Sequence, residues 1–122
     1  MPRRHNTKRI NGGPQGNDAF ISVKKLAWSE RDAYLEGLQK LLMDQESAFE
    51  RGDSAKVADL NRAILSYAAE RIVAWNWVDD DENTLPLPKD KPELVDQLYA
   101  DEVTFLARET VKVLLGELDE KN

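Results

Sequence analysis

Two consecutive stretches of the chain carry apolar residues at the spacing of amphipathic helices. Ser29 is an expected N-cap for the first helix, which Arg51-Gly52 ends, and Asp53 or Ser54 is an expected N-cap for the second. Intervals of three, four and seven residues predict one buried face on each helix. In the first these residues are Leu35, Leu38, Leu42 and Phe49, widened by Tyr34, Leu41 and Met43; in the second they are Val57, Leu60, Ile64, Tyr67, Ala68, Ile72 and Trp75. The short link predicts an antiparallel helical hairpin, with the second helix stopping by Val78.

The flanking segments are shorter and less regular. Residues 20–26 alternate in part and are rich in β-formers, which favours a short strand or an extended strap. Leu85-Pro86-Leu87-Pro88 must be extended, because a residue before proline is pushed out of the helical region. Pro92 suits the start of a short helix through Tyr99, and Asp101 is an expected cap for a last one. We therefore expect a mainly α fold, a hairpin plus one or two shorter C-terminal helices.

Composition divides the chain into three parts. Residues 1–19 hold several glycines and prolines and too few apolar residues to form a face, so we expect a flexible basic arm. Residues 20–118 form a single helical domain in this interpretation, and residues 119–122 form a charged tail. A chain of 122 residues suits one domain.

The net charge of −6 conceals an asymmetry between the arm and the rest. Residues 1–17 carry four basic residues and no acid, whereas residues 18–122 carry thirteen basic and twenty-three acidic residues, a balance of 13 − 23 = −10. An acidic body repels nucleic acid, and four cations without stacking aromatics predict weak nucleic-acid binding or none. There are no cysteines, and no stretch approaches the ~20 apolar residues of a membrane span. We expect a cytoplasmic protein that does not bind membranes.

The sequence offers no set of residues from which an active site could be assembled. The single histidine, His5, lies in the predicted arm without a positioned partner. Asp79, Asp81, Asn83 and Asp90 fit positions one, three, five and twelve of a calcium loop, but Thr84 replaces the required glycine and the twelfth residue is not glutamate. We therefore predict no catalytic residue, no metal site and no cofactor, and a protein that is not an enzyme.

The tryptophans are the most informative apolar residues. Aromatic side chains fill cores and are enriched in interface hot spots. We expect at least one tryptophan to close the small core, where the Leu-Pro segment crosses the hairpin, and another to be left for a partner. The predicted partner-binding residues are Trp28, Trp75, Trp77, Leu85 and Leu87. On this interpretation, replacing Trp77 with alanine weakens binding and leaves the fold largely intact.

Three stretches together carry a family resemblance. They are Val23-Lys24-Lys25-Leu26-Ala27-Trp28-Ser29-Glu30, Ile72-Val73-Ala74-Trp75-Asn76-Trp77-Val78-Asp79-Asp80, and Leu85-Pro86-Leu87-Pro88 with its two closing helices. In that order they resemble the tail assembly chaperones of long-tailed bacteriophages, over about residues 20 to 115. Ala27 and Ser29 stand where threonine and glycine are commoner in that family, and the acidic turn lacks its usual glycine.

The resemblance implies a non-enzymatic function in the cytoplasm of the host cell. Such chaperones coat the aggregation-prone tape-measure protein, leave as tail-tube proteins arrive, and are absent from the finished particle. The implied partners are thus the tape-measure protein and the tail-tube protein, and oligomerisation is left open. The alternatives are a structural virion protein (a head-tail joining, decoration or minor tail subunit), which would stay in the particle, and a regulatory module that binds one partner tightly.

Overall fold

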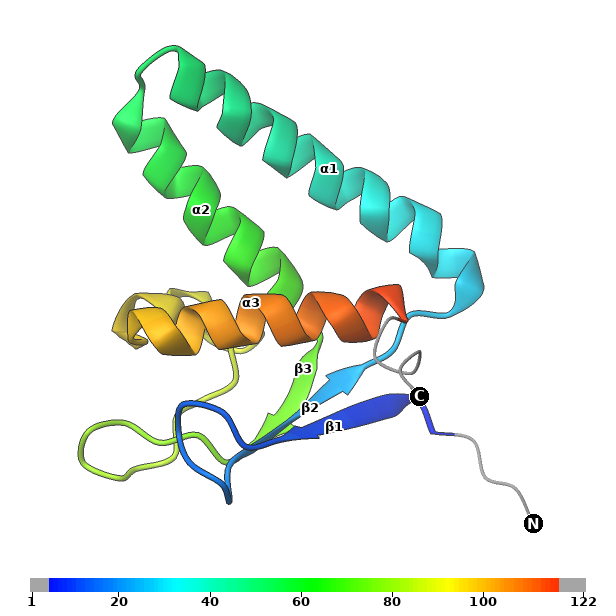
Figure 1. Cartoon of the computed structure of the whole chain (residues 1–122), viewed down its shortest axis with the longest axis vertical. Coiled ribbons are helices and arrows are strands. Elements are labelled where there is room, and N and C mark those ends of the chain that lie inside the picture. The colour runs from blue at the N-terminus through cyan, green and yellow to red at the C-terminus, as the bar shows by residue number, and fades with distance from the viewer. Residues whose placement is uncertain (1–4, 117–122) are drawn as a thin grey trace.

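The computed structural model describes residues 5–116 and arranges them in three layers (Figure 1). In chain order the elements are strands β1 (Thr7–Asn11) and β2 (Phe20–Lys24), helices α1 (Trp28–Glu50) and α2 (Ser54–Ala69), strand β3 (Ile72–Trp75), the 3-10 helix η1 (Pro92–Gln97) and helix α3 (Ala100–Leu115). Helix α3 contacts both β2 and α2. It therefore lies between the sheet and the α1–α2 hairpin, which projects away from the sheet.

The prediction of a mainly α fold is wrong, because the chain forms a three-stranded antiparallel sheet of order β1-β2-β3. β2 is the central strand and pairs Ile10 with Ile21 on one side and Ile21 with Trp75 on the other. Ile21 and Val23 alternate with Ser22 and are fully buried, so one face of this strand packs into the core. The protein is a mixed α/β domain.

The second helix ends earlier than the sequence predicts. α2 stops at Ala69, and residues 72–75 turn back as β3 against β2. The end of the helix could not be predicted from the apolar spacing of three and four, because Ile72 and Trp75 fit a helical face as well as a short strand. The β-branched pair Ile72-Val73 favours the strand, and Arg71 fixes the turn by donating from Nη2 to the carbonyl of Lys25 at 2.7 Å.

The N-terminal segment is part of the fold where the structure describes it, so its prediction as a flexible arm is wrong there. β1 pairs along its whole length with β2, and residues 12–19 connect the two strands. In this connection Gln15 donates from Nε2 to the carbonyl of Val78 and to Glu102, at 2.9 and 2.8 Å, and accepts from the N–H of Val78. The predicted charged tail at 119–122 lies outside the described residues.

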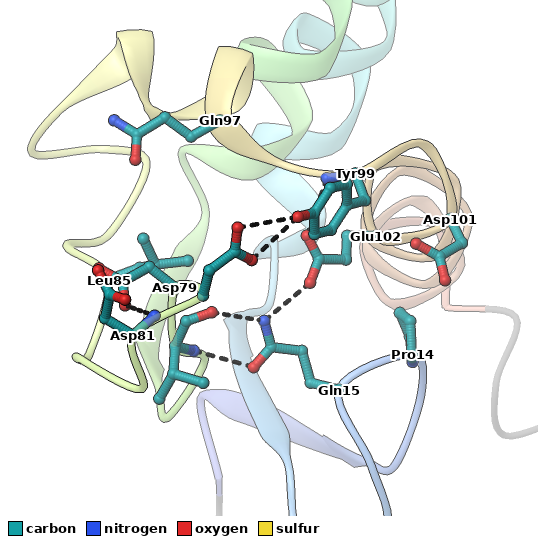
Figure 2. A pocket seen from close by; sticks show the side chains of 11 residues that line it. Pro14, Gln15, Asp79, Asp81, Leu85, Gln97, Tyr99, Asp101 and Glu102 are labelled. Atoms are coloured by element: carbon teal, nitrogen blue, oxygen red, sulfur yellow. Dashed lines mark hydrogen bonds between the residues drawn. The ribbon is translucent and has the colours of Figure 1, made fainter.

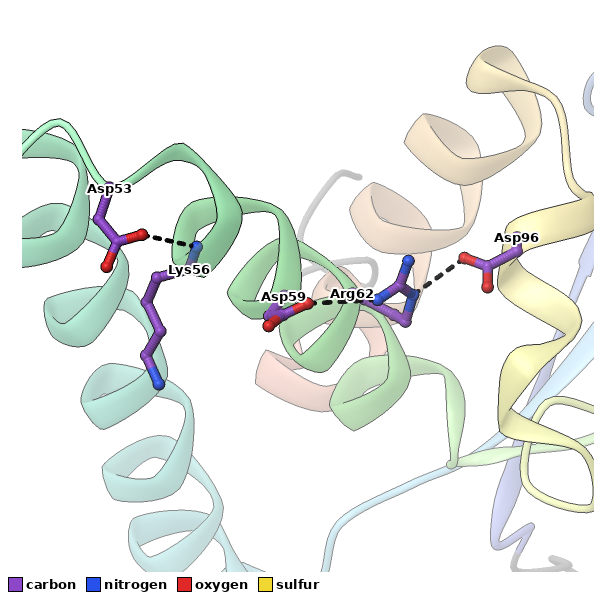
Figure 3. A network of polar contacts seen from close by, with 5 residues as sticks. All are labelled: Asp53, Lys56, Asp59, Arg62 and Asp96. Carbon is purple, nitrogen blue, oxygen red and sulfur yellow. Dashed lines mark hydrogen bonds and ion pairs between the residues drawn. The ribbon is translucent and has the colours of Figure 1, made fainter.

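The predicted helical hairpin is present as α1 and α2, and its connection follows simple capping chemistry. Gly52 adopts a left-handed φ of 73° after α1. The Asp53 carboxylate accepts from the N–H of Lys56 at 3.2 Å and caps α2 (Figure 3). Farther along α2, Arg62 donates to Asp96 of η1 at 2.9 Å, an exposed ion pair that joins the hairpin to the body.

The core lies between the sheet, α3 and the segment that follows β3. Its members include Ile21, Ile72, Trp77, Leu94 and Leu106, all fully buried. Apart from Ala69, no residue of the hairpin belongs to this cluster of buried residues, although Tyr34 packs against it. The molecule therefore has a compact body and a hairpin supported mainly by its own helix–helix contacts.

Candidate protein-binding surfaces

Three of the five predicted partner-binding residues lie in the core. Trp77 is 0% exposed, and Trp75 and Leu85 are also buried. The two indole rings stack with centroids 5.0 Å apart, and Trp75 donates from Nε1 to the carbonyl of Leu85 at 3.0 Å. Residues two apart on an extended chain project from the same face, so both tryptophans enter the core together. Assigning Trp75, Trp77 and Leu85 to partner binding is therefore a wrong prediction.

The other two predicted residues differ from each other. Trp28 is 84% exposed at the start of α1, and its ring packs only loosely against the Arg31 guanidinium, 5.5 Å from the ring centroid. Leu87 is half-buried and packs against the core. Of the predicted set, Trp28 alone offers a large accessible apolar surface. It lies at the opposite end of α1 from the tip of the hairpin (Figure 1).

Helix α1 exposes an apolar stripe that the sequence assigned to the core. Leu35, Leu42 and Phe49 follow one another at seven-residue intervals, which on an α-helix keeps them on one side with a drift of about 20° per interval. We call these three residues the α1 stripe. Leu35 is half-buried, whereas Leu42 is 45% and Phe49 74% exposed. Across α1, all of which the structure describes, Ala48 is the only fully buried residue.

The stripe is exposed because α1 packs extensively on one helix, α2. α1 contacts α2 extensively, but α1 has 23 residues and α2 has 16, and α3 packs on α2 instead. Leu38 and Leu41, half-buried, accompany Ala48 on the side that faces α2. The stripe lies roughly a quarter turn from that side. The seven-residue spacing of the stripe was the sequence signal for it. This spacing differs from the mixed spacing of the residues that pack between α1 and α2.

A pair of tyrosines joins the open end of the hairpin. Tyr34 of α1 stacks on Tyr67 of α2 with ring centroids 4.6 Å apart. Each hydroxyl donates to the other residue's carbonyl, at 2.9 Å from Tyr67 and 3.4 Å from Tyr34. Burial is the main cause that raises the pKa of both phenols, and for Tyr34 the neighbouring Tyr67 adds to it. This pair fixes the spacing between the helices and hence the surface that α1 presents.

A hollow on the body is lined by several acidic residues. Its lining comprises Pro14, Gln15, Val78, Asp79, Asp80, Asp81, Leu85, Gln97, Tyr99, Asp101 and Glu102, around a volume of about 540 Å³ (Figure 2). Asp79 accepts the N–H groups of Asp81 and Asn83, and Asp80 accepts the Tyr99 hydroxyl at 2.9 Å. The latter hydrogen bond raises the pKa of Tyr99. These carboxylates hold the loop and the start of α3 in place.

Residues 5–116 contain neither a candidate metal cluster nor a helix that could span a membrane. No group of three or more His, Cys, Asp or Glu between residues 5 and 116 is placed to hold a metal ion, which includes the calcium-like frame around Asp79. His5 is exposed at the edge of the sheet. None of the helices within the same range is long and apolar enough to cross a bilayer. The exposed large apolar side chains of the described residues include Trp28, Leu42 and Phe49.

Comparisons with known proteins add no relative. The chain matches no protein-family model, no curated protein and no solved structure.

Proposed function

We propose that this chain is a non-enzymatic tail assembly chaperone of long-tailed bacteriophages, which binds the tape-measure protein in the host cytoplasm. The observation that carries the proposal is the α1 stripe on a hairpin that projects from the folded body (Figure 1). The sequence resemblance over residues 20 to 115 supplies the identity of the client. The two lines of support are independent, since the stripe does not belong to the three stretches that carry the resemblance.

The geometry of the stripe suits a helical client. Apolar residues at seven-residue intervals pack against a partner helix with the same spacing, as in a two-stranded coiled coil. The tape-measure protein that such chaperones coat is long and helical, and therefore offers this kind of surface repeatedly. Leu42 and Phe49 project enough apolar surface to anchor one segment, while a stripe of three residues keeps the contact small. A small contact allows release when tail-tube protein arrives.

The charge of the body serves the same function. Residues 18–122 carry a balance of −10, so a client covered by several copies gains a strongly acidic surface. Like charges repel and keep such complexes from associating with one another. A bound chaperone thus both covers apolar residues of the client and adds solubilising charge.

Co-expression with the tape-measure protein of the same phage tests the proposal. The intact chain should keep the client in the soluble fraction and co-purify with it. Leu42→Asp/Phe49→Asp should abolish both effects, because two carboxylates cannot be buried against an apolar helix without a large desolvation cost. The matched control is Ala33→Asp/Ser47→Asp, which adds the same two charges at exposed positions on the far side of α1.

The outcomes separate the alternatives. Loss of client solubility in the stripe variant alone, with both variants equally folded by circular dichroism, supports the proposal. Equal behaviour of the two variants would show that the stripe does not bind the client. Failure of the intact chain to solubilise the tape-measure protein, combined with its presence in purified particles, would instead support a structural virion protein.

A further inference from the structure

We infer that the groove beside Trp28 is a second docking site, specific for an acidic peptide segment that carries a leucine-like side chain. We call it the Trp28 groove; its lining is Lys8, Lys25, Leu26, Trp28, Arg31, Val113, Leu114, Leu115 and Gly116, around a volume of about 370 Å³. It is formed where β1, the end of β2, the start of α1 and the end of α3 meet. This site shares no residue with the α1 stripe and goes beyond client binding.

Charge selects the partner. Lys8, Lys25 and Arg31 are the titratable side chains among the described residues of the lining, and all three are cationic. The remainder of the protein is strongly acidic, with a balance of −10 over residues 18–122. An acidic segment is therefore repelled by most of the surface and attracted here. A segment with the opposite charge would be held by the body and excluded from this groove.

The apolar part of the groove selects a branched aliphatic side chain. Leu26 and Leu115, both half-buried, supply aliphatic surface, and the buried core residues Val113 and Leu114 lie beneath them. Trp28 stands beside it, 84% exposed, with the Arg31 guanidinium 5.5 Å from its ring. A leucine of the bound peptide would bury the indole of Trp28 and the aliphatic surface together. Tryptophan side chains are enriched among the residues that anchor interfaces.

The helix ends at the groove do not oppose an acidic segment. α1 begins here, and its cap residue Ala27 has no hydrogen-bonding side chain; the Ala27 N–H donates to the Glu30 carboxylate, and the Ala27 carbonyl accepts from the Glu30 N–H. Its partial positive charge faces an anion favourably. The opposing end of α3 is partly neutralised, because the N–H of Gly116 bonds to the carbonyls of Lys112 and Val113.

Single-stranded nucleic acid is a weaker fit to the same groove. Nucleic-acid channels combine a basic track with several stacking aromatics. Here one tryptophan stands beside aliphatic residues, and the acidic body repels an extended polyanion more strongly than a short peptide. A short acidic peptide with a leucine can pair with the cations and pack on the aliphatic side chains of the groove.

Fluorescence with the full chain tests the inference. The probe is a fluorescein-labelled peptide in which glutamates and aspartates flank two leucines, compared with a peptide whose acids are replaced by glutamine and asparagine. Anisotropy should show saturable binding of the acidic peptide, at least about tenfold tighter than of the neutral one. Binding should also protect Trp28 from acrylamide, because Trp75 and Trp77 are already buried and contribute little quenching.

Charge-matched variants locate the site. Lys25→Glu/Arg31→Glu should weaken acidic-peptide binding at least about tenfold, whereas Lys40→Glu/Lys56→Glu, which changes net charge equally at exposed positions on the hairpin, should change it less than about twofold. Equal effects of both pairs, equal binding of the neutral peptide, or displacement of the acidic peptide by a single-stranded oligonucleotide at equal concentration would overturn the inference. None of these results depends on the tape-measure protein, so the groove and the proposed function can fail separately.

Discussion

Trp77 is the largest fully buried side chain among the described residues. It is 0% exposed, stacks on Trp75, and lies 6.2 Å between ring centroids from Phe105 of α3. The two neighbours come from β3 and α3, so this indole joins the sheet to the helix above it. Its removal would leave a cavity that neither rigid element can close by a small shift.

Replacing Trp77 with alanine should destabilise the fold by about 3–5 kcal/mol, a large part of the ~5–15 kcal/mol available to a domain. Urea unfolding followed by circular dichroism measures the change. Trp28→Ala is the control, and because that indole is exposed its effect should stay below about 0.5 kcal/mol. Similar unfolding midpoints for the two variants would show that Trp77 is not a core residue.

Residue type alone did not predict which tryptophan is exposed. Tryptophan is common in both cores and interfaces, so the composition of residues 75–77 favoured neither. The decision came from β3 and the residues that follow it, which bring Trp75 and Trp77 to the same face, and that strand depends on pairing with β2 far away in sequence. Trp28, which was predicted to bind a partner, is exposed.

The α1–α2 hairpin depends on a close contact at Gly37. A Cβ on Gly37 would overlap the Tyr67 hydroxyl and lie 3.0 Å from Cζ of the same ring. Tyr67 cannot move aside freely, because it stacks on Tyr34 and donates to its carbonyl. The glycine therefore allows the aromatic pair to bridge the two helices, which is a reason for a residue that otherwise weakens a helix.

Replacing Gly37 with alanine should destabilise the protein by about 1–2 kcal/mol, although glycine to alanine within a helix ordinarily stabilises by about 1 kcal/mol. In a Tyr67→Phe background the hydroxyl is absent and much of the penalty should disappear. A double-mutant cycle by urea unfolding gives the coupling. Additive effects, or stabilisation by alanine in the wild-type background, would contradict the packing described.

The same tyrosine pair predicts a stability change in alkali. Burial raises the pKa of Tyr34, so the folded protein keeps this proton at a pH where the unfolded chain, with tyrosine near ~10, has lost it. The unfolded state then binds fewer protons, and the free energy of unfolding falls as pH rises above about 10. Urea unfolding from neutral pH to about pH 11 should show a steeper fall for the wild type than for Tyr34→Phe. Parallel slopes would show that Tyr34 titrates normally in the fold.

Elements with local signals were predictable, and those with distant partners were not. The link at Gly52 and the Asp53 cap are recognisable within a few residues, and the hairpin they connect is present. β1 and β3, with five and four residues, lack any local pattern long enough to distinguish them from loop or helix. Their existence follows from antiparallel pairing with β2, which brings residues 7–11 and 72–75 to one sheet.

At the scale of the whole molecule, the fold separates the buried core from the exposed apolar residues of α1. The sheet, α3 and the segment after β3 bury the core, while the hairpin presents the α1 stripe away from it (Figure 1). Residues 18–122 carry a balance of −10, whereas the titratable residues that line the Trp28 groove are three cations. The seven-residue spacing of the stripe is visible in the sequence, but it predicted a buried face, and only the tertiary structure shows that within residues 5–116 α2 is the element that packs extensively on α1.

The most direct test of the proposed function is quantitative mass spectrometry of purified phage particles against the crude lysate. The account predicts a protein abundant in the lysate, recovered there with the tape-measure protein, and absent from finished particles. A fixed stoichiometric amount in the particles would contradict it and identify a structural subunit of the virion.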